Sequence, residues 1–247
     1  MANTATHSPL YVTKELFETR YQGAEAIFLA GSVIRGEASS YSDLDLVVVY
    51  PKLPAAYRES FTHRSWPVEA FIHDPDTLRY FFDKIDRELG RPTLAEMISE
   101  GHEVPGPSPT TDRLKHLARK TLLEGPPALS ESDLQDRRYQ LSELVDDIRE
   151  PRSRQELVAS ATVIYNELAD YYFRARREWT GGGKAIVKRL KKTDPGFGRK
   201  FTDAFDSLFV SGQTKPVIDL VEEILGRDGG LLFDGYRRDV PADWRLK

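Results

Sequence analysis

Two aspartates, Asp43 and Asp45, stand one residue apart at the start of an apolar run, DLDLVVVY, that is typical of a buried strand. Residues two apart in a strand face the same side, so these carboxylates project together while Leu44 and Leu46 point into the hydrophobic layer. Side by side they repel, unless a cation lies between them or one takes up a proton. Oxygen ligands of this kind suit Mg²⁺, which completes its shell with water and substrate phosphates. The pair predicts a metal–nucleotide site. The alternative is that one aspartate caps the strand or pairs with a nearby arginine, while the other is solvated.

Gly31 and Ser32 follow another apolar run, AEAIFLA, and we expect them to open a helix. The glycine lets backbone approach an anion closely, the serine adds a hydroxyl donor, and a helix N-terminus favours negative charge. Gly36 and the segment EASSYS then turn the chain back into the aspartate strand. A strand-to-helix turn that merely needs a glycine is the alternative. The aspartate pair later in the chain favours phosphate binding.

These residues resemble the signature of the nucleotidyltransferase superfamily with the DNA polymerase β-like fold, as found in the aminoglycoside, kanamycin and lincosamide nucleotidyltransferases. The pattern runs from Ala30-Gly31-Ser32 through a spacer to Asp43-Leu44-Asp45-Leu46. The fuller form also includes Arg35, Gly36, Ser42 and Val48. Such families often have a third carboxylate on a neighbouring strand, and Glu69 in PVEAFIHD stands in that context. The alternative for Glu69 is an edge-strand carboxylate that faces water.

The resemblance implies the roles of these residues. Asp43, Asp45 and Glu69 would be the catalytic and metal-binding residues, with Glu69 as the third ligand, the general base or both. The triphosphate would be bound by residues of the Gly-Ser segment and the loop after it, namely Gly31, Ser32, Arg35 and Ser42. Lys184 comes directly after the run WTGGG at the expected start of a helix, from which it would reach the triphosphate. A solvated lysine at an ordinary helix start is an equal alternative.

The order of elements predicts an α+β chain. Before about residue 105 we expect a helix at 10–22, strands at 24–30, 44–50 and 65–73, and a helix at 75–89. After it, helical periodicity predicts helices at 111–124, 131–149, 153–179, 184–193, 197–211 and 215–226. The Pro/Gly cluster EGHEVPGPSPTTDR lies between the two parts. We therefore expect a polymerase β-like nucleotidyltransferase domain with a mixed sheet at 1–105, and a helical bundle domain at 106–247.

Composition limits the classes of partner. The 247 residues carry a net charge of −4, which gives no overall field that selects nucleic acid or an anionic membrane. Without cysteine, only oxygen or imidazole ligands remain for an ion. No segment has the length of a membrane span, and the N-terminus lacks a signal-peptide pattern, so a cytoplasmic protein is expected. The run 174–200 is basic and 131–150 is acidic, which would direct phosphate and acceptor to different helices; solvated helix faces are the alternative for both runs.

The resemblance implies a Mg²⁺-dependent enzyme that transfers a nucleoside monophosphate, AMP from ATP, to a hydroxyl of a small molecule such as an antibiotic. Pyrophosphate is the other product. Two alternatives remain: the same chemistry on a protein or RNA acceptor, as in antitoxin-like or terminal nucleotide-adding enzymes, and a catalytically lapsed nucleotide-binding scaffold. A monomer and a homodimer are both compatible with the sequence.

Overall fold

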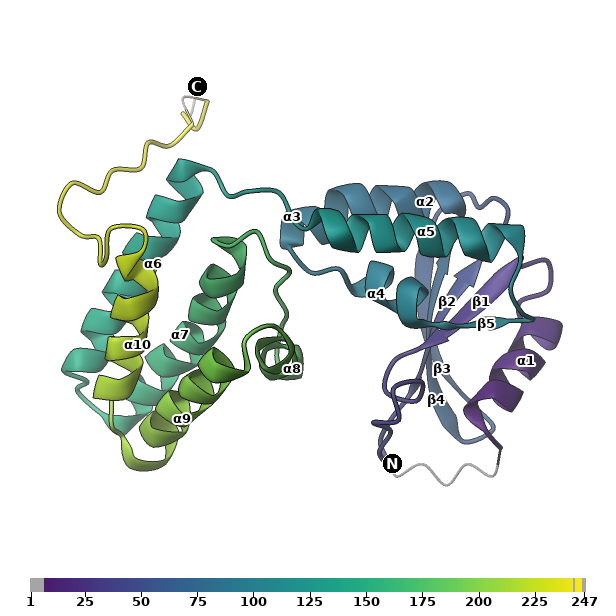
Figure 1. Cartoon of the computed structure of the whole chain (residues 1–247), viewed down its shortest axis with the longest axis horizontal. Coiled ribbons are helices and arrows are strands. Elements are labelled where there is room, and N and C mark those ends of the chain that lie inside the picture. The colour runs from purple at the N-terminus through teal and green to yellow at the C-terminus, as the bar shows by residue number, and fades with distance from the viewer. Residues whose placement is uncertain (1–6, 242, 246–247) are drawn as a thin grey trace. The chain divides into compact units, whose positions relative to one another are not determined.

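The computed structural model describes residues 7–241 and 243–245 of the chain. It forms two compact units, one ending at Gly125 and the other beginning at Pro126. Figure 1 shows a sheet flanked by helices in the first unit and helices alone in the second. The expected fold class, a mixed-sheet domain followed by a helical region, is confirmed.

The first unit is built on a five-stranded sheet in the order β3-β4-β2-β1-β5. The bounds are Ala26–Ala30 (β1), Leu44–Val49 (β2), Tyr57–His63 (β3), Trp66–His73 (β4) and His102–Val104 (β5). β2 and β4 pair in parallel, whereas all the other neighbours are antiparallel. The central strand β2 is almost wholly apolar because both of its faces are covered.

Helices cover both faces of this sheet (Figure 1). Their bounds are Pro9–Thr19 (α1), Pro75–Tyr80 (α2), Arg87–Leu89 (α3), Thr93–Glu100 (α4) and Pro109–Glu124 (α5), with a π-helical turn, η1, at Phe81–Asp86. Leu16 of α1 packs on the face that carries Leu44 and Leu46. Residues of α2, η1, α4 and α5 pack on the other face, against Val47 and Val49. Alternate side chains of β2 therefore pack into two separate hydrophobic cores, one on each face of the sheet.

The second unit is helical throughout its regular structure. It comprises Glu131–Arg149 (α6), Arg154–Arg174 (α7), Lys184–Thr193 (α8), Pro195–Ser211 (α9) and Lys215–Gly226 (α10), which share one apolar core. After α10 the chain returns to α6, where the ring of Tyr236 stacks on Tyr139 at 4.0 Å between centroids. None of the described helices is both long and apolar enough to cross a membrane.

Several elements differ from the sequence expectation. Gly31-Ser32 opens a turn over 32–36 and not the expected helix, and the helix expected at 153–179 ends at Arg174. β3, α4 and β5 were not expected. α5 belongs to the first unit because it packs on α4. The two units therefore divide between Gly125 and Pro126, later in the chain than the domain boundary that we expected between residues 105 and 106. That boundary between domains stays a prediction.

Asp86 is a buried carboxylate at the end of η1, only 5% exposed. It accepts hydrogen bonds from the backbone N–H groups of Leu94 and Ala95 in the first turn of α4. It therefore caps a helix whose own N-cap residue, Pro92, supplies no side-chain bond. Its Oδ2 has no hydrogen-bond partner. Burial raises the pKa of Asp86 to about 7, since the charged form is poorly solvated there.

Asp86→Asn should stabilise the protein at neutral pH. A folded-state pKa raised above the unfolded value of 3.8 means that stability present in acid is lost as pH rises toward 7. Because asparagine does not ionise, its advantage over the wild type should grow by about 2–3 kcal/mol between pH 5 and pH 8. Urea unfolding of both proteins at the two pH values measures this. If the two proteins differ in free energy of unfolding by the same amount at pH 5 and at pH 8, the buried charge of Asp86 does not destabilise the wild type.

Candidate active site

Three carboxylates meet at one end of β2 and β4. Asp43 directly precedes β2, Asp45 lies within it, and Glu69 lies beside Asp45 in the parallel register. One oxygen from each lies within 4.8 Å of the others, and all three residues are half-buried. Like charges this close repel, and a divalent cation relieves that repulsion. Among the described residues, this is the one group of three or more acidic or imidazole side chains that fits a metal ion.

The turn at Gly31 lets Asp45 occupy this position. Ala30 is the register partner of Asp45, so the chain leaves β1 directly beside the carboxylate. Gly31 has φ +78°, and a Cβ added there would lie 1.9 Å from Asp45 Oδ2. Any other residue at 31 would collide with the carboxylate and also adopt a left-handed backbone. The sequence predicted a close approach at this glycine, and the approaching group in the structure is Asp45.

Serine hydroxyls brace the loop between Gly31 and Asp43. Ser32 Oγ donates to Ser42 Oγ at 3.0 Å, and the backbone N–H of Ser39 donates to the same oxygen at 2.9 Å. The N–H of Glu37 donates to the carbonyl of Ser32 at 2.9 Å. Ser42 therefore ties both ends of the loop together, immediately before the first aspartate. Phosphate binding by Ser32 and Ser42 stays a prediction.

Arg35 and Lys184 were also expected at the triphosphate. Arg35 Nε donates to Glu37 at 3.0 Å, and Arg35 Nη1 lies 3.7 Å from a carboxylate oxygen of Glu100. Lys184 is exposed at the first residue of α8, in the second unit, where the N-cap Gly183 gives no side-chain bond. The contacts of Arg35 are thus with carboxylates of its own unit. The triphosphate roles of both residues stay predictions.

Sequence reasoning missed Arg58. Its Nη2 lies 2.6 Å from Glu69 Oε1, and its guanidinium carbon lies 4.9 Å from the ring centre of Phe71. Arg58 belongs to β3, whose segment YRESFTH has no apolar stripe that would identify it as a strand. The pairing of β3 with β4 creates the contact. Without that register, nothing in the sequence connects Arg58 to Glu69.

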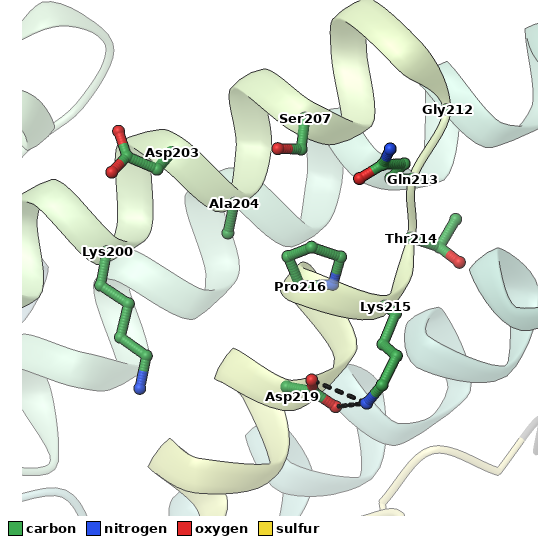
Figure 2. Close-up of a pocket in the computed structure, with 10 residues that line it drawn as sticks. All are labelled: Lys200, Asp203, Ala204, Ser207, Gly212, Gln213, Thr214, Lys215, Pro216 and Asp219. Carbon is green, nitrogen blue, oxygen red and sulfur yellow. Dashed lines mark hydrogen bonds and ion pairs between the residues drawn. The ribbon is translucent and has the colours of Figure 1, made fainter.

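A separate groove of about 870 Å³ lies in the helical unit, between α9 and α10. Figure 2 shows its lining side chains, with Lys215 bound to Asp219 on the same helix. Lys200, at its other end, pairs with Glu223. The lysines of this groove are therefore neutralised by neighbouring carboxylates. Nothing in this arrangement provides the convergent oxygen ligands seen at Asp43, Asp45 and Glu69.

Part of the first unit is similar to known proteins. Residues 11–101 match the family described as the nucleotidyltransferase domain. A solved structure of a nucleotidyltransferase-like protein from Exiguobacterium sibiricum 255-15 shares 13% identity, covering 88% of this chain and 74% of that chain, with a TM-score of 0.43. No curated protein matches the sequence. Residues 11–101 thus resemble a nucleotidyltransferase domain, and the three carboxylates lie within this matched segment.

Gly31→Ala should displace Asp45 and destabilise the fold. Gly36 provides a matched control, because its φ of +71° is similar but an added Cβ meets nothing within 4 Å. Both alanine variants bear the left-handed backbone cost of about 1–2 kcal/mol. Only Gly31→Ala adds the collision with the carboxylate, so it should lose more free energy of unfolding and also bind Mn²⁺ more weakly. Equal losses in the two variants, with equal Mn²⁺ affinity, would show that Gly31 serves the turn alone.

Proposed function

We propose that this chain is a nucleotidyltransferase that transfers a nucleoside monophosphate, AMP from ATP, to a hydroxyl of a small molecule with the help of Mg²⁺. The observation that carries the proposal is the group of three carboxylates within 4.8 Å, inside a domain that matches the nucleotidyltransferase family. An all-oxygen donor set fits Mg²⁺ and does not favour softer metals. Asp43, Asp45 and Glu69 would hold it.

The reaction is a displacement at the α-phosphorus of the nucleotide. The acceptor hydroxyl oxygen forms a new bond to that phosphorus, and the bond to the bridging oxygen of pyrophosphate breaks. The hydroxyl proton passes to a carboxylate of the cluster, for which Glu69 is the candidate. A bound divalent ion supplies charge stabilisation at the entering and leaving oxygens. The work of this chain is therefore to position the two substrates and to take one proton.

The donor phosphates would lie along the turn and loop that lead from β1 to β2. Gly31 and Ser32 stand at the turn, and Ser42 at the end of the loop beside Asp43. Arg35 would exchange a contact with Glu37 or Glu100 for phosphate, and the phosphate contact expected of Lys184 stays a prediction. A phosphate group offers these cations a stronger charge-assisted bond than an exposed carboxylate does.

The order of a transferase domain followed by a packed helical unit is the order expected for the small-molecule transferases that the sequence resembles. The acidic stretch on α6, with Glu143, Asp146 and Asp147, would attract a polycationic acceptor, while α8 carries basic residues suited to phosphate. Protein and RNA acceptors are the alternative for the same chemistry. A lapsed scaffold is disfavoured, since it has no reason to retain three carboxylates that repel one another.

Asp45→Asn should remove the Mg²⁺-dependent part of nucleotide binding. The substitution preserves the shape of the side chain but removes a charged ligand, so affinity for the Mg²⁺–nucleotide complex should fall by about 100-fold or more. Calorimetry with each of the four nucleoside triphosphates, with and without Mg²⁺, measures the loss and identifies the donor. Asp76→Asn, at an exposed position on α2, is the control. Binding by Asp45→Asn that matches the wild type would refute the assigned site.

The acceptor can be identified by transfer of label from α-³²P-labelled donor nucleotide. We expect label on a hydroxyl-bearing small molecule, in a panel beginning with aminoglycosides and lincosamides, and no transfer by the Asp43→Asn/Asp45→Asn double variant. Label on protein or on RNA ends would instead support the alternative acceptors. Retention of all label in the donor, across every class of acceptor, would favour the scaffold.

A further inference from the structure

Arg58 already supplies a positive charge to one of the three carboxylates. Its Nη2 lies 2.6 Å from Glu69 Oε1, while one oxygen of Glu69 also lies within 4.8 Å of oxygens from Asp43 and Asp45. Glu69 therefore has two neighbouring positions for a positive charge. The guanidinium of Arg58 occupies one, and the other lies beside Asp43 and Asp45. A single carboxylate that serves both must divide its charge between them.

The strand register fixes this arrangement. Ser60 of β3 lies directly opposite Glu69 of β4, and Arg58 lies opposite Phe71. Residues two apart share a face, so Arg58, Glu69 and Phe71 project on the same side of the sheet. Arg58 reaches diagonally to Glu69, with its guanidinium near the Phe71 ring. The side chain of Arg58 is 54% exposed, which leaves it room to turn away from Glu69 into solvent.

We propose that Arg58 competes with the divalent ion for Glu69 and so lowers the affinity of the site for the ion. The inference rests on the proposed function, because it concerns the same carboxylates. When the ion is absent, Arg58 balances one of three negative charges and reduces their mutual repulsion. When the ion binds, the guanidinium faces a divalent charge across a shared carboxylate and is repelled. Arg58 is thus a positioning residue, which acts through Glu69.

A contribution to folding stability alone explains the Arg58–Glu69 ion pair less well than competition with a divalent ion does. Exposed ion pairs contribute little to folding stability, and Arg58 and Glu69 are 54% and 32% exposed. The same edge strand carries Glu59, which pairs with Arg20 at the end of α1, on the opposite face of the sheet and outside the carboxylate cluster. The two pairs resemble each other in charge and exposure, and they differ in contact with the proposed metal site. Arg20 is therefore the matched control.

The test is a Mn²⁺ titration followed by electron paramagnetic resonance, which measures ion binding without turnover. Arg58→Gln removes the positive charge and retains an amide donor for Glu69, so Mn²⁺ affinity should rise by about two- to fivefold over the wild type. Arg58→Lys retains the charge and should bind Mn²⁺ as the wild type does. Arg20→Gln removes the same charge away from the cluster and should leave the affinity unchanged. Circular dichroism and thermal unfolding establish that the variants are folded.

An unchanged or weaker affinity in Arg58→Gln, while the wild type binds Mn²⁺, overturns the competition and leaves the proposed function intact. An equal rise in Arg20→Gln also overturns it, because the effect would then come from net charge alone. Failure of the wild type to bind Mn²⁺, with and without nucleoside triphosphate, overturns the inference together with the proposed function.

Discussion

The close approach of three carboxylates is the constraint on which the first unit depends. Asp45 and Glu69 are adjacent because β2 and β4 pair in parallel, and Asp43 joins them because it directly precedes β2. The apolar partners of these residues on both faces of β2 fix the strand, since slipping by one residue would bury the charges. Hydrophobic packing thus holds together groups that electrostatic repulsion would separate.

The strands and the loop of the first unit differ in how closely they are packed. Asp45 and Glu69 stand on strands between fully buried residues, and Asp43 directly precedes β2, whereas the loop from Ser32 to Ser42 is mostly exposed and is braced by a few hydrogen bonds. Catalytic geometry benefits from the first arrangement, because small displacements of reacting groups are costly. A loop with few packed contacts can adjust its backbone to a ligand more readily. The candidate metal ligands and the candidate phosphate-binding residues are therefore supported in different ways.

Apolar runs made β1, β2 and β4 predictable, and helical periodicity between Gly- and Pro-containing segments made α5 to α10 predictable. The same criteria missed β3, whose alternation is weak because it is an exposed edge strand, and β5, which has only three residues. The helix expected at Ser32 was wrong because a glycine after a strand signals a turn but does not specify the next element. The candidate ligands could be found from spacing, since Asp43 and Asp45 are close in sequence. Arg58 could not, because it meets Glu69 only through pairing of two strands.

The close contact between Gly31 and Asp45 makes substitutions at position 31 depend on the residue at position 45. While the carboxylate of Asp45 is present, a side chain at position 31 has no space, so position 31 cannot change before position 45 does. Replacement of Asp45 by a small residue would vacate the space where a Cβ at 31 now collides, leaving only the backbone preference at φ +78°. In chains descended from a common ancestor, a bulky residue at the position of Gly31 would thus mark a lineage that had already abandoned its second aspartate.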